Sequence, residues 1–298
     1  MQFRKEMTAA HRKILFIVNP SAGKKKNIDL KEFIQKNFSL PDFKVAISSS
    51  LEYFEEIKKE VLSGNYTDVV ACGGDGTVNK VAAFACENKL RLGILPLGSG
   101  NGLARSVGIS MNLGKALRQV EAGKTKRIDV GVLNGKLFFC ASGMGFDSHI
   151  AALFEKTTGR GLAGYLKLIW KEYFSYKEEN YTIKIDGKEV NSNSFIVACC
   201  NSGQYGNDFY IAPTADMTDG KITVSLIKPF HWLRAPYILL KVMLKKAHTL
   251  NIVETHHAER IEIKRMQNGY VHIDGEPLEG GQEIHLSVKP LALEIICG

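Results

Sequence analysis

Continuous apolar runs alternate with amphipathic segments along the first part of the chain. Residues 13–18, 69–72 and 92–96 are apolar runs typical of strands that are buried in a parallel sheet. The segments between them carry apolar residues at helical spacing, as in 51–61. This alternation of strand and helix predicts a parallel α/β domain over residues 1–127.

The pattern changes in the second part of the chain, residues 128–298. Short strand-like runs now alternate with turn signals, among them Asn134-Gly135 and Asp186-Gly187, which favour β-hairpins. Two helical patterns interrupt the strands, at about 163–174 and 229–247. We therefore predict an antiparallel β domain for this part.

Two glycine-rich turns each follow a predicted strand and precede a predicted helix. The first is Gly73-Gly74-Asp75-Gly76-Thr77, and the second is Gly98-Ser99-Gly100-Asn101-Gly102. Glycines let the backbone approach a phosphate closely, and the free N–H groups of a helix start point towards it. The alternative for the first motif alone is an ordinary turn between a strand and a helix. Two such turns after two strands favour a phosphate-binding pair.

Asp75 is an unusual residue for a phosphate loop, because its carboxylate would repel the phosphate. It therefore acts through Mg²⁺ or accepts a proton from an attacking hydroxyl group. The sequence motif alone leaves both interpretations open.

Composition adds a preference for anionic partners. The net charge of +8 and the pI near 9.0 suit nucleotides, anionic lipid surfaces or nucleic acid. Basic residues are not interleaved with aromatic ones as in nucleic-acid-binding motifs, so we expect no nucleic acid partner. No run of about 18 apolar residues and no secretory signal is present. None of the six cysteines forms a Cys-x-x-Cys pair, so we expect neither a zinc site nor a disulfide framework. A reducing cytoplasm is the expected location.

The ordered motifs resemble those of the diacylglycerol kinase catalytic-domain family, which includes bacterial lipid kinases and sphingosine kinases. The segments that carry the resemblance are Asn19 to Gly23, Gly73 to Asn79, Leu95 to Arg105, Ala212 to Gly220, and Ile273 to Glu276. The resemblance implies an NAD kinase-like α/β domain followed by an antiparallel β-sandwich domain, with the active site in the cleft between them. It also implies ATP and Mg²⁺ as cofactors, and transfer of the γ-phosphate to a lipid hydroxyl of the diacylglycerol or sphingoid type.

The resemblance also implies roles for particular residues. Asp274 is the expected general base and Asp75 the organiser of Mg²⁺ and phosphate, although the reverse assignment stays open. Asp219, with the carbonyl groups of Asp216 and Lys221, would hold a structural Mg²⁺.

Further residues would bind the substrates. Asp147 would contact the polar head group of the lipid. The nucleotide site would be formed by Asn19, Ser21, Ser48 (or one of its two serine neighbours), Gly73, Gly74, Asp75, Gly76, Thr77, Gly98, Ser99, Asn101, Gly275 and Glu276.

One departure from the family pattern keeps other functions open. Asn101-Gly102 stands where many diacylglycerol kinases have Asn-Asp, and this form is closer to that of the sphingosine kinases. The missing acid leaves a non-catalytic nucleotide-binding regulator as one alternative. A soluble-substrate kinase is the other, because NAD kinases also contain Gly-Gly-Asp-Gly-Thr.

Residues 230–248 combine aromatic, aliphatic and basic side chains. Such a helix can lie in the interface of an anionic membrane, so we expect peripheral membrane association alongside the lipid substrate. The alternative is a helix that packs on the β domain with its lysines in solvent. A homodimer also stays open, and the family implies a role in phospholipid metabolism.

Overall fold

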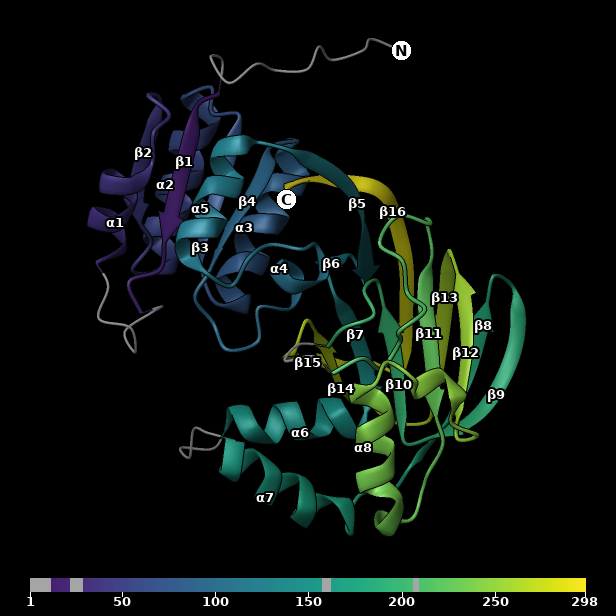
Figure 1. Ribbon diagram of the computed structural model, residues 1–298. Helices are drawn as coiled ribbons and strands as arrows, with labels where there is room; N and C mark the ends of the chain where they lie inside the picture. The colour runs from purple at the N-terminus through teal and green to yellow at the C-terminus, as the bar shows by residue number, and fades with distance from the viewer. Residues whose placement is uncertain (1–11, 22–28, 157–161, 206–208) are drawn as a thin grey trace. The chain divides into compact units, whose positions relative to one another are not determined.

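The computed structural model describes residues 12–21, 29–156, 162–205 and 209–298, which form two compact units (Figure 1). The first unit contains the described residues up to Ile128 together with 291–298, and the second contains 129–290. The sequence analysis assigned residues 291–298 to the β domain. The chain passes between the units within β5 (Thr125–Leu133) and within β16 (Glu283–Ile296).

A parallel sheet forms the centre of the first unit. Its strands lie in the order β2 (Phe43–Ile47), β1 (Ile14–Val18), β3 (Asp68–Gly73) and β4 (Arg91–Pro96), and the end of β16 pairs in parallel with β4. Every residue of β1 and β3 is buried, which explains their continuous apolar sequences. The predicted parallel α/β fold is confirmed.

Helices connect these strands, and most begin with a side-chain cap. They are α1 (Leu30–Asn37), α2 (Leu51–Ser63), α3 (Asp75–Asn88), α4 (Gly102–Ser106) and α5 (Leu113–Ala122). Asp29, Ser50 and Asn112 each accept a bond from a backbone N–H three residues further on, and so start α1, α2 and α5. In contrast, α3 begins after Gly74 without a side-chain cap. Its first backbone N–H groups are therefore available to an anion.

Antiparallel strands form two sheets in the second unit. One contains, in order, β12 (Val253–Ala258), β11 (Ile222–Ile227), β10 (Ile196–Cys200), β7 (Ala141–Gly145), β14 (Gly269–Ile273) and β15 (Glu276–Gly280). The other contains β16, β13 (Arg260–Arg265), β8 (Glu179–Ile185) and β9 (Lys188–Ser194), while β5 pairs with β6 (Lys136–Phe138). One core cluster joins Val197 and Val224 of the first sheet to Ile183 of the second, as in a β-sandwich.

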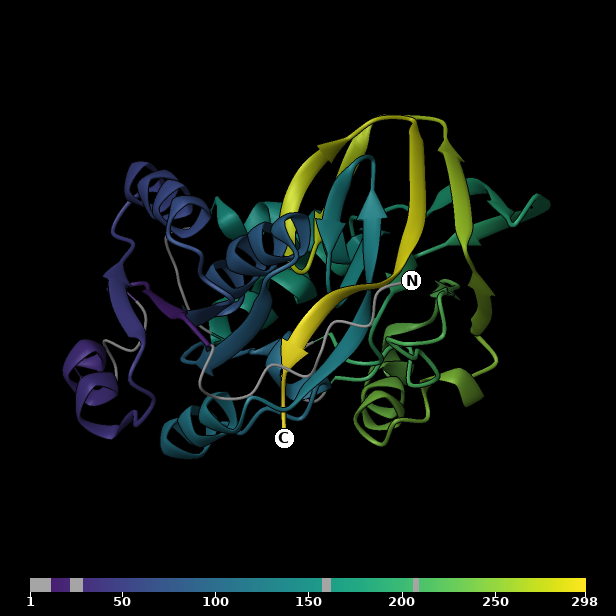
Figure 2. The ribbon, with the colours of Figure 1, turned by 90° about the horizontal axis from the view of Figure 1, so that it is seen from above.

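Tight turns at Asn-Gly and Asp-Gly pairs connect several of these strands. Asn134-Gly135 and Asp186-Gly187 have positive φ angles at both positions, as predicted for two-residue hairpin turns. Asp274-Gly275 is a third such turn, between β14 and β15. Figure 2 shows β16 in yellow, and Leu291 within it has a φ of 47°.

Three helices accompany the sandwich: α6 (Phe146–Glu155), α7 (Leu162–Tyr173) and α8 (Ala235–Met243). The sequence analysis missed α6, which begins after Gly145 without a side-chain cap and so lacks the usual start signal. The helix expected over 229–247 is shorter, because Pro236 begins α8 anew after a short 3₁₀ turn at Trp232–Arg234. Across the described residues, every helix is too short or too polar to span a bilayer.

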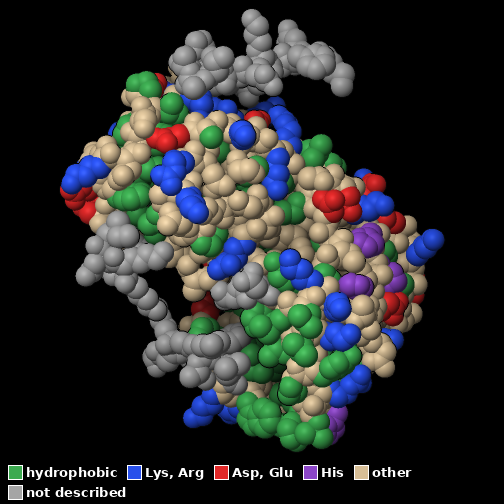
Figure 3. Space-filling view, viewed as in Figure 1, with side chains coloured by type: hydrophobic (Ala, Val, Ile, Leu, Met, Phe, Trp, Pro, Cys, Tyr) green, Lys and Arg blue, Asp and Glu red, His purple; other side chains and the backbone are tan. Residues whose placement is uncertain are grey.

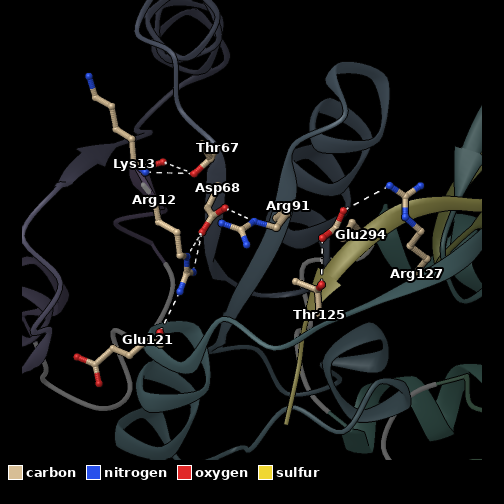
Figure 4. Close-up of polar contacts among 9 residues, drawn as sticks. All are labelled: Arg12, Lys13, Thr67, Asp68, Arg91, Glu121, Thr125, Arg127 and Glu294. Carbon is tan, nitrogen blue, oxygen red and sulfur yellow. Dashed lines mark hydrogen bonds and ion pairs between the residues drawn. The ribbon is translucent and has the colours of Figure 1, made fainter. Parts of the chain in front are cut away.

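A buried ion cluster holds the start of the parallel sheet (Figure 4). Asp68, at the first position of β3, is fully buried between two guanidinium groups. Its Oδ2 accepts from Arg12 Nε at 2.7 Å, and its Oδ1 accepts from Arg91 Nε at 2.6 Å. Arg12 also donates to the carbonyl oxygen of Glu121 at 2.9 Å, which attaches α5 to the same cluster.

We expect Asp68→Ala to lower the free energy of unfolding by about 3–5 kcal/mol, because it leaves two buried guanidinium groups without their carboxylate. Chemical denaturation measures this change. The control Glu87→Ala removes an exposed acid of α3 and should change stability by less than about 0.5 kcal/mol. Equal stability of the two variants would contradict the assignment of Asp68 as the central residue of this cluster.

Candidate functional site

The two glycine-rich turns lie side by side because β3 and β4 are adjacent parallel strands, with Gly73 opposite Pro96. A carboxylate joins the two turns. Asp75 Oδ2 accepts a hydrogen bond from the backbone N–H of Asn101 at 3.0 Å, and Oδ1 accepts one from Gly102 at 2.8 Å. The N–H groups at the start of α4 are therefore satisfied by Asp75, a residue distant in the sequence, and not by a local capping side chain.

Close backbone contacts explain why glycines are needed here. A Cβ atom at Gly98 would lie 2.8 Å from Cα of Gly74, and one at Gly100 would lie 2.8 Å from Asp75 Oδ2. Either contact would force the turns apart, since both distances are shorter than real Cβ contacts.

Asn101 shapes the second turn. It has a φ of 50°, and its side chain is almost completely buried. Its Oδ1 accepts from Gly98 N–H at 3.0 Å and its Nδ2 donates to the Gly98 carbonyl at 2.8 Å. Both ends of the amide are thus used within the turn, and Asn101 is absent from the lining of the cavity described next.

A cavity of about 950 Å³ opens beside the two turns. Most residues predicted for the nucleotide site line it: Asn19, Ser21, Ser48, Gly74, Asp75, Gly76, Thr77, Gly98 and Ser99. Gly73 lies behind them at the buried end of β3. Asn19 bridges two parts of the wall, because its Nδ2 donates to Thr77 Oγ1 at 2.9 Å while its Oδ1 accepts from Ser21 N–H at 2.9 Å.

The wall combines positive and apolar groups. The uncapped start of α3 contributes a partial positive charge, and Lys80 adds a full one from the next turn of the same helix. Leu51, Phe54 and Val81 supply apolar surface. The sequence analysis missed Lys80, although its spacing of four residues from Gly76 places it on the same helix face. Three further lysines, Lys24, Lys25 and Lys26, follow Ser21 in the sequence and lie outside the described residues.

Asp274 lies in the second unit, in the turn between β14 and β15. Its Oδ1 accepts from the N–H groups of Cys140 and Ala141 at 2.7 and 2.9 Å, and its Oδ2 accepts from Phe139 at 2.8 Å. Burial raises the pKa of Asp274 above its ordinary value, against the opposite effect of these three bonds. Next to it, Gly275 N–H points to His272 Nδ1 at 3.4 Å.

Asp147, near the start of α6, contacts the side chains of His272, Tyr205 and Ser148. Its Oδ2 lies 3.1 Å from His272 Nε2 and 3.3 Å from the Tyr205 hydroxyl group, which donates to it. Its Oδ1 accepts from the backbone N–H of Ser148 at 2.7 Å. Glu276, in contrast, is exposed at the start of β15.

The segment predicted to hold Mg²⁺ forms a loop with internal hydrogen bonds. Asp216 Oδ1 accepts from the N–H and hydroxyl groups of Thr218, and Asp219 Oδ1 accepts from Lys221 N–H at 2.9 Å. Gly220 N–H donates to the buried Asp129 at 2.7 Å. Among the described residues, no cluster of three or more His, Cys, Asp or Glu side chains has the geometry of a metal site. One carboxylate with backbone carbonyls and water still fits Mg²⁺, which needs few protein ligands.

Comparisons with known proteins identify both domains of the chain. Residues 13–133 match the diacylglycerol kinase catalytic domain, and residues 141–297 match the YegS C-terminal NAD kinase beta sandwich-like domain. The chain is 32% identical over 239 residues to a "Probable lipid kinase YegS-like" of Citrobacter koseri, with 76% of each protein covered. It is 28% identical over 247 residues to a protein of the same description from Pseudomonas aeruginosa, with 80% and 79% covered.

Solved structures share the fold. A diacylglycerol kinase from Bacillus anthracis superposes with a TM-score of 0.73 at 19% identity, over 96% of this chain and 97% of that one. An NAD kinase from Archaeoglobus fulgidus, in complex with ATP, superposes with a TM-score of 0.52 at 15% identity, over 95% and 93%. The predicted NAD kinase-like fold with a β-sandwich domain is confirmed.

We expect Asp75→Asn to lower the free energy of unfolding by about 1–3 kcal/mol, because its new amide N–H₂ faces a backbone N–H of the second turn. Thermal or chemical denaturation without any ligand measures the loss. Ser99→Ala changes an exposed side chain of the same turn and should stay within about 0.5 kcal/mol of the native chain. If Asp75→Asn is as stable as Ser99→Ala, the carboxylate does not join the two turns.

Proposed function

Because the chain belongs to the diacylglycerol kinase family, in its YegS-like group of lipid kinases, we propose that it transfers the γ-phosphate of ATP to a lipid hydroxyl group. The acceptor is a lipid of the diacylglycerol or sphingoid class. The observation that carries this proposal is the pair of glycine turns joined by Asp75 beside a cavity that is lined by the uncapped start of α3 and by Lys80.

The cavity suits a nucleoside triphosphate. Its volume of about 950 Å³ lies at the upper end of the usual range for ligand pockets. The N–H groups at the start of α3 and the backbone at Gly98 would receive the phosphates, with Lys80 nearby as a counter-charge. Leu51, Phe54 and Val81 offer apolar surface for the base.

Mg²⁺, when bound, would neutralise charge on the phosphates and anchor them. Both oxygens of Asp75 already accept a backbone N–H, and each carboxylate oxygen can accept about one more partner. Asp75 can thus hold the turns and still bind a hydrated ion. Asp219, with the carbonyls of Asp216 and Lys221, is our candidate for the separate structural ion.

Asp274 is our candidate for the general base. Its Oδ1 accepts two backbone N–H groups, but Oδ2 accepts one and so keeps capacity for a lipid hydroxyl. A carboxylate of raised pKa takes a proton more readily, which suits this role. Asp147 is our candidate for the polar head group of the lipid. His272 and Tyr205 would fix its orientation.

We expect the purified protein to transfer label from [γ-³²P]ATP with Mg²⁺ to a dispersed lipid alcohol. The panel contains diacylglycerol, monoacylglycerol, sphingoid base, ceramide and undecaprenol, with NAD as the soluble acceptor. Transfer to NAD instead would favour the soluble-substrate kinase. ATP binding without transfer to any acceptor would favour the non-catalytic regulator, and either result would overturn the proposal.

We expect Asp274→Asn to lower kcat by about 10²–10⁴-fold. The carboxylate is the proton acceptor, so kcat/KM of the native enzyme should rise with pH through the elevated pKa of Asp274, and this rise should be lost in the variant. ATP affinity, measured by equilibrium titration, should change little, because the cavity belongs to the other unit. Glu279→Gln, an exposed acid on β15, is the control. A pH profile unchanged in Asp274→Asn would remove Asp274 as the base.

A further inference from the structure

Helix α8 leaves most of its apolar surface in solvent. None of its residues is buried, and it attaches to the sandwich through Ile238, which packs near Ile227 and Leu250. Seven large apolar side chains of α8 and its flanking turns are exposed: Trp232, Leu233, Tyr237, Leu239, Leu240, Met243 and Leu244. A helix that only packed on its own domain would bury its apolar stripe.

Exposed aromatic residues at the C-terminal end of α7 extend this surface. Trp170 and Phe174 are 57% and 59% exposed, and the ring of Trp170 meets that of Trp232 edge to face at 5.5 Å. Figure 3 shows hydrophobic side chains gathered over α8, with lysine and arginine beside them. We call this region, formed by α8, its flanking turns, Trp170 and Phe174, the α7–α8 face.

The charged residues of α8 and its flanking turns are all basic. The sequence contains no Asp or Glu between Lys221 and Val253, whereas Arg234, Lys241, Lys245 and Lys246 all lie on α8 or next to it. A symmetric contact between two copies would bring these basic residues together. An anionic lipid surface, in contrast, takes up both the apolar and the basic groups.

We infer that the α7–α8 face docks on an anionic lipid bilayer, with the tryptophans at the level of the head groups. This inference rests on the proposed lipid kinase function and names the surface through which the enzyme meets its substrate membrane. At nine residues, α8 is too short to span a bilayer, so it lies in the interface. Trp170 and Trp232 are suited to that position because their rings are both apolar and polar.

Intrinsic fluorescence tests this inference directly, because Trp170 and Trp232 are the two tryptophans of the chain. The full-length protein is mixed with vesicles of phosphatidylcholine alone or of phosphatidylcholine with phosphatidylglycerol. We expect co-sedimentation and a blue shift of the emission only with the anionic vesicles, and both should decrease as salt is added. Binding without a change in emission would assign the contact to another surface and overturn the inference.

Matched variants separate the two components of the contact. Lys245→Glu with Lys246→Glu should weaken partitioning by more than about tenfold, because each basic side chain near an anionic surface strengthens binding about fivefold and each new glutamate is repelled. Leu240→Asp with Leu244→Asp should abolish the blue shift. The control, Lys115→Glu with Lys136→Glu, makes the same change in net charge at exposed sites outside the α7–α8 face and should bind nearly as the native chain does.

Two further measurements complete the test. Activity on detergent-dispersed lipid should be the same in the native chain and in the α7–α8 variants, because no bilayer is needed there. If the native chain shows no activity on detergent-dispersed lipid, the proposed function is wrong. If all variants bind vesicles equally well, only the proposed docking surface is wrong. Size-exclusion chromatography should give the same size for all of them, and a dimer that the leucine variants dissociate would make the α7–α8 face a subunit interface.

Discussion

The first unit depends on a carboxylate that accepts two backbone N–H groups. Asp75 begins α3 after the first glycine turn, yet its two oxygens satisfy Asn101 and Gly102 at the start of α4. This contact holds the second turn so close to the first that a Cβ atom at Gly98 would lie 2.8 Å from Cα of Gly74. Asp75, an unexpected acid in a phosphate loop, thus has a structural role. This role requires no metal ion.

The second unit uses its acids in a similar way. Asp274 closes the turn between β14 and β15 and accepts three N–H groups from the segment that leads into β7. Asp147 joins His272 and Tyr205. Hydrogen bonds therefore fix the orientation of both carboxylates. The proposed roles, general base for Asp274 and head-group contact for Asp147, require such a fixed geometry.

Much of the fold could be predicted from the sequence, because buried parallel strands and Asn-Gly turns leave strong local patterns, as at Ile14–Val18 and Asn134. Contacts between distant segments could not. Nothing around Asp75 indicates that its partners lie at residues 101 and 102, and nothing around Asp68 indicates Arg12 and Arg91. The α7–α8 face was visible only in part, since the pairing of Trp170 with Trp232 depends on tertiary structure.

Residue-resolved hydrogen exchange tests the central claim, that two joined glycine turns form the nucleotide site. Without ligand, the amides of Asn101 and Gly102 should already exchange slowly, because Asp75 accepts both. ATP with Mg²⁺ should then slow the amides of Gly76, Thr77 and their neighbours in the first turn of α3. Fast exchange at Asn101 and Gly102 in the free protein, or no protection of α3 by ATP, would contradict the account.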